Sequence, residues 1–324
     1  MTAAGARDGR AAGGAAAVAR PVAASPSSAL RVLAVATLAG TFALVALGST
    51  VRVTESGMGC PGWPLCYGQI GPIDHLHSLL EQVHRYLAAL VTIAACATAL
   101  QAWRSRPQRA IWPALAAVGI VAVQVVLGAV TVITHNAPVT VALHLATGLL
   151  LLASTAVTAV ACSGTSQSRD APVLRPGRLG AAAVVATFVL LVSGSIVVDG
   201  GASASCPSWP WCVPRGHVAD ALVVIVLVHR AAALVATALV AAVALGTLAR
   251  RRERAPTAVG LAWVLLGLCA SEVAVGAVTA VLAAPPAAQD VHLALAAALW
   301  ACVVGSVALA SYGDAAVGPV AAGG

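Results

Sequence analysis

The heptapeptide CPGWPLC at residues 60–66 returns as CPSWPWC at residues 206–212, after an offset of 146 residues. Three other landmarks recur at nearly the same offset along the chain. They are Val83-His84-Arg85 with Val228-His229-Arg230, Gly128–Thr131 with Gly276–Thr279, and His144 with His292. Landmarks that repeat at one near-constant offset predict an internal duplication. Each half then has one cysteine loop and two histidines within apolar segments.

The composition excludes an ordinary soluble domain. Of 324 residues, 60% are hydrophobic and 9% are charged, and the mean hydropathy is +0.93. A bilayer core of roughly 30 Å requires about 20 apolar residues per helix. Eight stretches meet this requirement: 31–53, 78–101, 112–134, 139–162, 178–199, 219–248, 257–283 and 289–311. The sequence therefore predicts an all-α membrane protein, with eight transmembrane helices in two pseudo-symmetric four-helix bundles.

The arginines indicate how the helices cross the membrane. All 18 basic residues are arginine, and most gather before the first predicted helix and after the second, fourth and sixth. By the positive-inside rule these loops and both termini are expected to be cytoplasmic. The predicted parts are a disordered cytoplasmic tail at 1–30, a first half at 31–165, a second half at 166–311 and a cytoplasmic tail at 312–324. The net charge of +7 follows from this topology, and no basic face for nucleic acid is evident.

Four cysteines lie in the two long loops that this topology places outside the cell. Cys60, Cys66, Cys206 and Cys212 are therefore on the oxidising side, where disulfides persist. Five residues between the cysteines, including two prolines and a tryptophan, favour a structural clip. Redox-active centres usually have two intervening residues. A thiol relay stays open as the alternative, because exposed disulfides are often labile.

The four repeated histidines lie inside predicted helices, in the half of each helix nearer the cysteine loops. They are His84, His144, His229 and His292. Ionisable groups at membrane depth are rare and usually face the bundle interior, where they have a partner. A single histidine is as well explained by a hydrogen bond between helices. Four at matching places give each half two imidazoles, and bis-imidazole ligation of haem iron is the economical explanation. Two histidines underfill a closed site for isolated zinc or copper.

One position differs chemically between the halves. Glu81 lies one turn before His84 on the same face of its helix, whereas the matching residue of the second half is Val226. An unmatched carboxylate at membrane depth is a candidate for chemistry. The alternative is that Glu81 hydrogen-bonds a histidine or caps its helix.

Other polar residues within the helices carry weaker indications. Arg85 and Arg230 directly follow their histidines, and they are candidates for pairing with haem propionates or for snorkelling to the interface. Gln124 and Glu272 occupy matching sites one turn before the repeated glycine. They are expected to hydrogen-bond across helices.

At these residues the chain resembles the haem A synthase family, membrane enzymes that convert haem O to haem A for terminal oxidases. The matching pieces are Thr54–Cys66 (TESGMGCPGWPLC), Glu81–Arg85 (EQVHR), His144, the second cysteine loop, His229-Arg230 and His292. The resemblance covers residues 31–311. Members of the family have eight helices in two pseudo-symmetric four-helix halves. For this chain that implies a substrate-haem side at 31–165 and a b-type-haem side at 166–311.

The resemblance also implies roles for single residues. His84 and His144 would be the axial ligands of the substrate haem, and His229 and His292 would ligate a haem b cofactor. Glu81 would match the catalytic carboxylate of the family. Cys60–Cys66 and Cys206–Cys212 would be its extracytoplasmic disulfides.

The implied reaction oxidises the C8 methyl group of haem O to a formyl group, through hydroxymethyl and hydrated-aldehyde stages, in the cell membrane. A carboxylate beside that edge would stabilise positive charge or take the proton. The haem b of the second half would conduct electrons. The expected partners are haem O, membrane lipid, haem O synthase, a terminal oxidase or its assembly factors, and an unidentified electron acceptor.

Two other functions remain open on the sequence. A di-haem b quinone oxidoreductase would use both haems as permanent cofactors, and it predicts symmetric halves with no unmatched acid. A membrane thiol-disulfide oxidoreductase would place the chemistry in the cysteines and would need none of the histidines. The haem spectrum of the purified protein separates the second alternative from the other functions.

Overall fold

The computed structural model describes residues 26–71, 75–105, 108–163, 177–213, 217–252, 254 and 256–313. Within these residues the chain forms eight α-helices and one 3₁₀ turn, and it contains no β-strand. The elements are α1 (Ser28–Val53), η1 (Ser56–Met58), α2 (Leu76–Ser105), α3 (Gln108–Ile133), α4 (Pro138–Cys162), α5 (Arg178–Asp199), α6 (Asp220–Ala249), α7 (Pro256–Val281) and α8 (Pro286–Gly313). Each α-helix is long and apolar enough to cross a membrane, so the predicted class of all-α membrane protein is confirmed.

The helices start and end within four residues of their predicted bounds. α1 begins at Ser28, inside the segment predicted as a tail. It starts there because the Ser27 hydroxyl accepts a hydrogen bond from the backbone N–H of Leu30 at 3.2 Å and caps the first turn. α8 likewise continues to Gly313, past its predicted end. The rest of the predicted tails at 1–30 and 312–324 lies outside the described residues.

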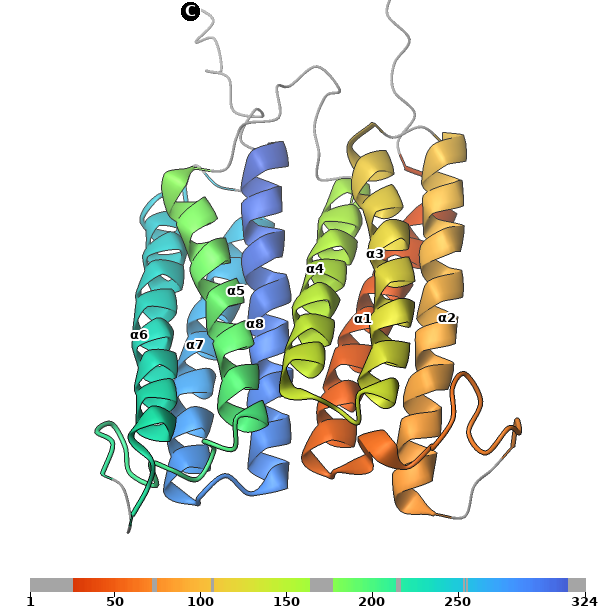
Figure 1. Cartoon of the computed structure of the whole chain (residues 1–324). Coiled ribbons are helices and arrows are strands. Elements are labelled where there is room, and N and C mark those ends of the chain that lie inside the picture. Colours follow the sequence, from red (N-terminus) through yellow and green to blue (C-terminus); the bar gives the residue numbers. More distant parts are fainter. Residues whose placement is uncertain are drawn as a thin grey trace, which may run out of the picture.

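The helices pack as two groups of four. In the first group α1 and α3 each lie against both α2 and α4, and in the second group α5 and α7 each lie against both α6 and α8. The groups join where α8 contacts α1 and α4, and where α4 contacts α5 (Figure 1). The helices α2 and α4, and likewise α6 and α8, therefore stand across their group from each other. This arrangement leaves their inward side chains facing one interior.

Buried apolar side chains of α4, α5 and α8 fill the joint between the groups. Trp300 of α8 is 2% exposed, and its indole N–H donates to the carbonyl of Leu149 in α4 at 2.7 Å. Its ring lies 5.8 Å from that of Phe188 in α5. A buried indole whose N–H is paired contributes apolar area without an unsatisfied donor. Trp300 thus ties elements of both groups together.

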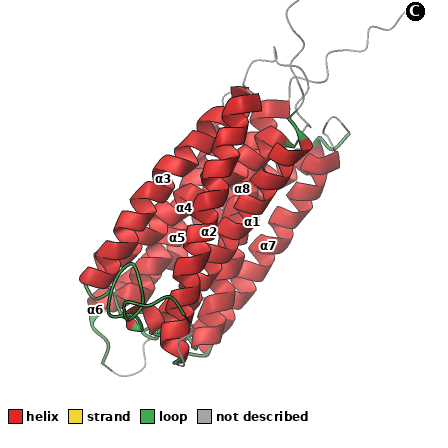
Figure 2. Cartoon of the chain, turned by 90° about the vertical axis from the view of Figure 1, so that its right-hand side faces the viewer, coloured by secondary structure: helices red, strands yellow, loops and turns green. Residues whose placement is uncertain are grey.

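The two ends of the bundle are different. Both cysteine loops lie at one end, together with the turns that join α3 to α4 and α7 to α8, while α1 begins and α8 ends at the other (Figure 1). Seen from the side, the helices share one long axis (Figure 2). The chain thus returns after its eight passes to the end where it started. That this end faces the cytoplasm stays a prediction from the arginines.

The α3–α4 and α7–α8 turns have the same backbone conformation. His135 and Asn136 have φ of 53° and 55°, and the matching Ala283 and Ala284 both have φ of 58°. The second residue of each pair donates its N–H back to a threonine carbonyl of the preceding helix, at 2.8 Å and 2.7 Å. Left-handed alanine costs roughly 1–2 kcal/mol. The second turn therefore keeps its geometry despite an unfavourable residue type.

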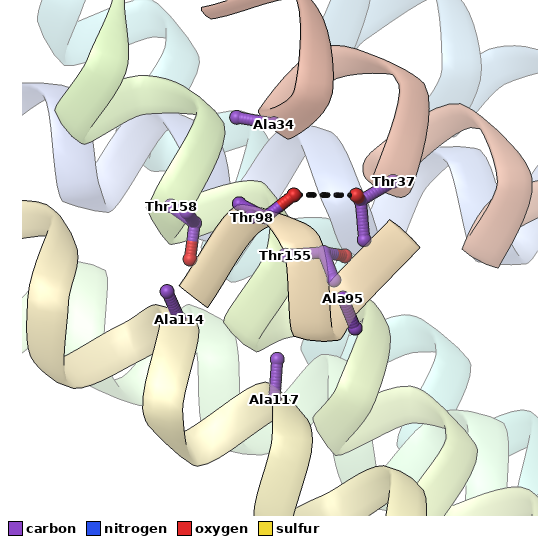
Figure 3. A pocket seen from close by; sticks show the side chains of 8 residues that line it. All are labelled: Ala34, Thr37, Ala95, Thr98, Ala114, Ala117, Thr155 and Thr158. Carbon is purple, nitrogen blue, oxygen red and sulfur yellow. Dashed lines mark hydrogen bonds between the residues drawn. The ribbon is translucent and has the colours of Figure 1, made fainter. Parts of the chain in front are cut away.

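The part of the first group far from the cysteine loops contains a small cavity lined by alanines and threonines (Figure 3). Its lining residues are Ala34, Thr37, Ala95, Thr98, Ala114, Ala117, Thr155 and Thr158. The hydroxyls of Thr37 and Thr98 hydrogen-bond across α1 and α2 at 2.9 Å. At three matching positions the second group holds Val240, Leu265 and Val303 in place of Ala95, Ala117 and Thr155, and these three belong to one packed core cluster. The second group therefore has larger apolar side chains than the first at two of these positions.

Candidate functional site

The four histidines lie within about the first three turns of α2, α4, α6 and α8, at the cysteine-loop end. Each imidazole lies against a glycine of an adjacent helix. The pairs are His84 with Gly48, His144 with Gly128, His229 with Gly194 and His292 with Gly276. A Cβ placed on these glycines would come 3.1 to 3.5 Å from the ring carbon Cε1. The glycines therefore make room for the rings, and the repeat of Gly128 as Gly276 has a packing reason.

The histidines of each half lie near one another. His84 is within electrostatic range of His144, and His229 is within that range of His292. Each pair projects from helices that stand across their group, so two imidazoles meet in one interior. Among the described residues no cluster of three or more His, Cys, Asp or Glu could hold a bare metal ion. Two imidazoles are a donor set that fits haem iron, since the porphyrin supplies the remaining ligands.

The ring nitrogens Nδ1 differ between the halves. Nδ1 of His229 lies 2.8 Å from Oγ of Ser193 in α5. Nδ1 of His292 lies 2.9 Å from Oε2 of Glu272 in α7, a close polar contact that lacks hydrogen-bond geometry. Nδ1 of His84 and Nδ1 of His144 are likewise buried and form no hydrogen bond with the described residues, and neither has a carboxylate oxygen as close as that of Glu272. The second half thus offers each imidazole an oxygen that the first half does not.

Glu81 joins α2 to the first cysteine loop. Its side chain is buried, and Oε2 accepts a hydrogen bond from the backbone N–H of Cys60 at 2.8 Å. Its other oxygen, Oε1, forms an ion pair with Arg85 one turn later on the same helix. Val226, at the matching place of α6, instead packs with Ala202 and Cys206 in an apolar cluster. The first cysteine loop is therefore hydrogen-bonded to the carboxylate of Glu81, whereas the second packs against the apolar side chain of Val226.

The two arginines that follow the histidines hold the cysteine loops. Arg85 donates to the carbonyl of Gly62 at 2.6 Å, and Arg230 donates to the carbonyls of Ser208 at 2.8 Å and Cys206 at 3.0 Å. Backbone carbonyls in a tight loop converge on one guanidinium because it presents several donors in a fixed plane. A contact of either arginine with a haem propionate stays a prediction.

The paired cysteines lie at disulfide distance. The Cα atoms of Cys60 and Cys66 are 4.7 Å apart, and those of Cys206 and Cys212 are 4.9 Å apart. Both loops contain a cis peptide bond at Trp-Pro, at Pro64 and at Pro210. Each loop lies over the end of its group, close to the histidines. This placement fits a structural clip, although the redox role of the cysteines stays a prediction.

Two features were not found from the sequence. Ser193 is one of many serines in apolar segments, and only comparison of the halves, where Leu47 takes its place, would have marked it. Arg52, at the end of α1, forms an ion pair with Asp199, at the end of α5, and Asp199 also accepts a hydrogen bond from Ser195. The ion pair joins the two groups at the cysteine-loop end. In the sequence, the position of Asp199 at the end of an otherwise apolar segment could have indicated this ion pair.

Comparison with known proteins decides the family. The sequence profile of the family described as "Cytochrome oxidase assembly protein" matches residues 31–304. A "Heme A synthase" of Shouchella clausii is 30% identical over 217 residues, which are 63% of this chain and 71% of that protein. The chain belongs to the haem A synthase family. The predicted family is therefore confirmed.

Two other relatives are matched over smaller shares of their own lengths. A "Heme A synthase" of Exiguobacterium sibiricum is 30% identical over 175 residues, 51% of this chain and 58% of that protein. The chain thus spans less than two thirds of the length of this relative. A "Protoheme IX farnesyltransferase" of Halobacterium salinarum is 34% identical over 142 residues, 44% of this chain but 30% of that protein. The similarity to the farnesyltransferase covers a minor part of that protein.

Proposed function

We propose that this protein makes haem A by oxidising the C8 methyl group of haem O to a formyl group. The observation that carries the proposal is that the two halves share four histidines in glycine-lined places, but only the first has a buried carboxylate, Glu81, one turn before its first histidine, where the second has Val226. Membership of the haem A synthase family supports the same reaction. The enzyme is an oxidoreductase of haem biosynthesis in the cell membrane.

The first half is the substrate site in this proposal. His84 and His144 bind the iron of haem O and thereby fix the porphyrin in the interior between α2 and α4. With water as the source of oxygen, R–CH3 + H2O gives R–CHO through a hydroxymethyl stage, and four protons and four electrons are released, the electrons passing to the acceptor in the membrane. The porphyrin spreads the positive charge that develops at that carbon.

Glu81 acts on the reacting methyl group. Its carboxylate is held by Arg85 and by the backbone N–H of Cys60, so its position is fixed before substrate arrives. A fixed negative charge in a low-dielectric interior stabilises developing positive charge strongly, because no solvent must reorganise. The carboxylate also accepts the proton that the methyl group releases.

The second half binds a permanent haem b through His229 and His292. When bound, this haem supplies one-electron transfer between the substrate site and an electron acceptor in the membrane. The protein residues contribute the two imidazoles and an apolar surrounding. Arg230, next to His229, donates hydrogen bonds to the backbone carbonyls of Cys206, Ser208 and Pro210. These bonds hold the second cysteine loop at this end of α6.

The proposed partners follow from the substrate. Haem O is prenylated, so its supply requires an enzyme that attaches a prenyl group to haem. The similarity of part of a protohaem IX farnesyltransferase to this chain supports haem O synthase as a partner. The product serves a terminal oxidase, and the family description supports an assembly step for that oxidase.

A di-haem b quinone oxidoreductase is the second candidate. The shared histidine and glycine pairs favour it as much as they favour the proposed enzyme. The unmatched Glu81 does not, because two permanent haems need no such difference. A function as thiol-disulfide oxidoreductase does not explain why four histidines pack against four glycines in matching places.

The decisive experiment uses a host that makes haem O but cannot convert it. The chain is expressed there, and the haems of the membranes are extracted and separated by chromatography with mass analysis. Conversion of haem O to haem A is expected, and His84→Ala is the matched control that keeps the second half intact. If membranes with folded, haem-loaded protein contain haem O but no haem A, the proposed reaction is wrong.

A further inference from the structure

The hydroxyl of Ser193 decides which nitrogen of His229 carries the proton. Oγ of Ser193 lies 2.7 Å from the carbonyl of Leu190, so its single hydrogen is donated there. The same oxygen lies 2.8 Å from Nδ1 of His229 and is left with lone pairs to accept. Nδ1 therefore carries the hydrogen and Nε2 carries the free lone pair. This is the tautomer that presents Nε2 to a metal.

Glu272 lies close to His292 without forming a hydrogen bond with it. It lies one turn before Gly276, the glycine that makes room for this imidazole, and Oε2 is 2.9 Å from Nδ1. A carboxylate accepts and does not donate, so the electrostatic contact favours the hydrogen on Nδ1. Glu272 also brings a negative charge to a ring that a metal would polarise.

The first half has a different residue at each of these positions. Leu47 precedes Gly48 where Ser193 precedes Gly194, so His84 receives no hydroxyl. Gln124 replaces Glu272, but its amide turns away from the ring and donates to the backbone carbonyl of His144 at 2.9 Å.

A glycine explains why Gln124 turns away. A Cβ placed on Gly148 would lie 2.8 Å from Nε2 of Gln124, so only glycine lets the amide pass. In α8 the matching residue is Ala296, which has that Cβ. The Cβ of Ala296 thus blocks for Glu272 the side-chain conformation that Gln124 adopts, and the carboxylate of Glu272 stays near the imidazole of His292. The difference between the halves is built into the packing as well as into the residue types.

We propose that Ser193 and Glu272 are positioning residues that hold His229 and His292 in one ring orientation and one tautomer. This makes the haem of the second half permanent, while the first half, which lacks both contacts, exchanges its haem. The inference rests on the proposed function, because it requires that both pairs bind haem. Beyond that function, it identifies the residues that make the second half retain its haem while the first half releases its haem. Outer contacts of this kind fix the orientation of a metal-bound imidazole and raise its basicity.

The test measures haem release and redox potential in the purified, haem-loaded full-length protein. Ser193→Ala and Glu272→Gln are each prepared, and transfer of haem b to added apomyoglobin is followed by absorbance. Both variants are expected to weaken haem retention by about 10–100-fold. Glu272→Gln is also expected to move the midpoint potential of haem b in the positive direction, because loss of a negative charge favours the reduced iron.

Matched variants separate positioning from packing. Ser193→Thr keeps a hydroxyl and is expected to restore retention. Leu47→Ala and Gln124→Ala change the matching sites of the first half, and the release of haem b from the second half should stay at its original rate. The reverse design, Leu47→Ser with Gln124→Glu and Gly148→Ala, is expected to slow release from the first half. A His229→Ala background shows which half each signal comes from.

The outcomes distinguish the two claims. Unchanged release and unchanged potential in both Ser193→Ala and Glu272→Gln, with haem still on His229, would overturn the inference and leave the proposed function standing. The proposed function is wrong if the unaltered protein binds no haem, or if His229→Ala keeps the haem b signal, and the inference is then wrong as well. Both of these results are measured without the Ser193 and Glu272 variants, so they can be told apart from a failure of the inference alone.

Discussion

The first and second helix groups place histidines on the same turns and against glycines in the same places, yet their surroundings differ in kind. Beside His84 there is a buried carboxylate, whereas beside His229 there is an apolar cluster around Val226. Nδ1 of His84 has no hydrogen-bond partner among the described residues, whereas that of His229 has a serine oxygen. A duplicated framework thus fixes where two imidazoles meet. Single side chains around them decide what each pair does.

The largest expected effect is loss of the haem b signal when a second-half ligand is removed. His229→Ala or His292→Ala should abolish the low-spin bis-histidine spectrum, because one imidazole cannot complete the axial ligation. His84→Ala, the matched change in the first half, should leave most of that spectrum. Optical and electron paramagnetic resonance spectra of the purified protein measure this. Equal spectra in all three variants would remove the distinction between the halves.

Glu81→Gln tests whether the unmatched acid is chemical or structural. The amide keeps the size of the side chain and an acceptor for the N–H of Cys60, but it loses the negative charge. Loss of one preorganised electrostatic partner typically costs about 10²–10³ in rate. The variant should fold, keep haem b, and convert haem O poorly, with accumulation at the hydroxymethyl stage.

The measurement for Glu81→Gln is the amount of haem O, hydroxylated intermediate and haem A, normalised to haem b. Arg85→Gln is a useful companion because it removes the ion pair and keeps the acid. A normal yield of haem A from Glu81→Gln would refute the catalytic role and favour the di-haem alternative. Reduced expression with normal activity per folded molecule would show that Glu81 has a structural role and stabilises the first cysteine loop.

The two cysteine loops are expected to respond differently to the loss of their bridges. Replacing either pair by serine should lower the free energy of unfolding by about 2–4 kcal/mol, if both pairs are oxidised. Only loss of Cys60–Cys66 should also impair haem O conversion, because the N–H of Cys60 holds Glu81. Alkylation with and without reduction, followed by peptide mass mapping, establishes the oxidation state. Free thiols at all four positions in fresh membranes would contradict the predicted topology.

The glycines that face the histidines are the next weak points. A methyl group on Gly48 or Gly194 would come 3.1 or 3.3 Å from the facing ring carbon, closer than side chains usually pack. Overpacking of this kind costs about 1–3 kcal/mol. Gly48→Ala should therefore reduce haem O conversion, and Gly194→Ala should reduce the content of haem b.

The control for the glycine variants is another matched pair. Gly119 of α3 and Gly267 of α7 have nothing within 4 Å of an added Cβ, so alanine should fit and should slightly favour the helix. Thermal unfolding and haem content are measured for all four variants. A loss of haem from Gly119→Ala or Gly267→Ala as large as that from Gly194→Ala would show that general helix packing, and not room for the ring, is responsible.

The smallest expected effect concerns the small cavity of the first group, lined by alanines and threonines. Thr155→Val gives it the residue that the second group has at the matching position, Val303. The hydroxyl of Thr155 hydrogen-bonds the carbonyl of Leu152 in its own helix at 3.0 Å. Its loss should change the free energy of unfolding by about 0.5–1.5 kcal/mol. A decrease above this range would show that the cavity lining holds the first group together more than its packing suggests.

The sequence by itself determined the number of helices, their bounds within a few residues, and the family. Apolar length fixes a membrane helix almost without reference to its neighbours, because every backbone hydrogen bond is satisfied inside the segment. The recurrence of landmarks along the chain was also enough to identify the four histidines and the unmatched Glu81. The roles of these residues in binding haem remain predictions that the variants described above test.

Only the tertiary structure decided which groups the site residues contact. Glu81 reaches back 21 residues to the N–H of Cys60, and Arg52 pairs with Asp199 across 147 residues and two helix groups. Ser193 reaches His229 across 36 residues, and Glu272 reaches His292 from another helix. Hydropathy cannot report such contacts, since they depend on the rotation and depth at which two helices pack. Those are set by which small residues, such as Gly148 in place of alanine, let one side chain pass another.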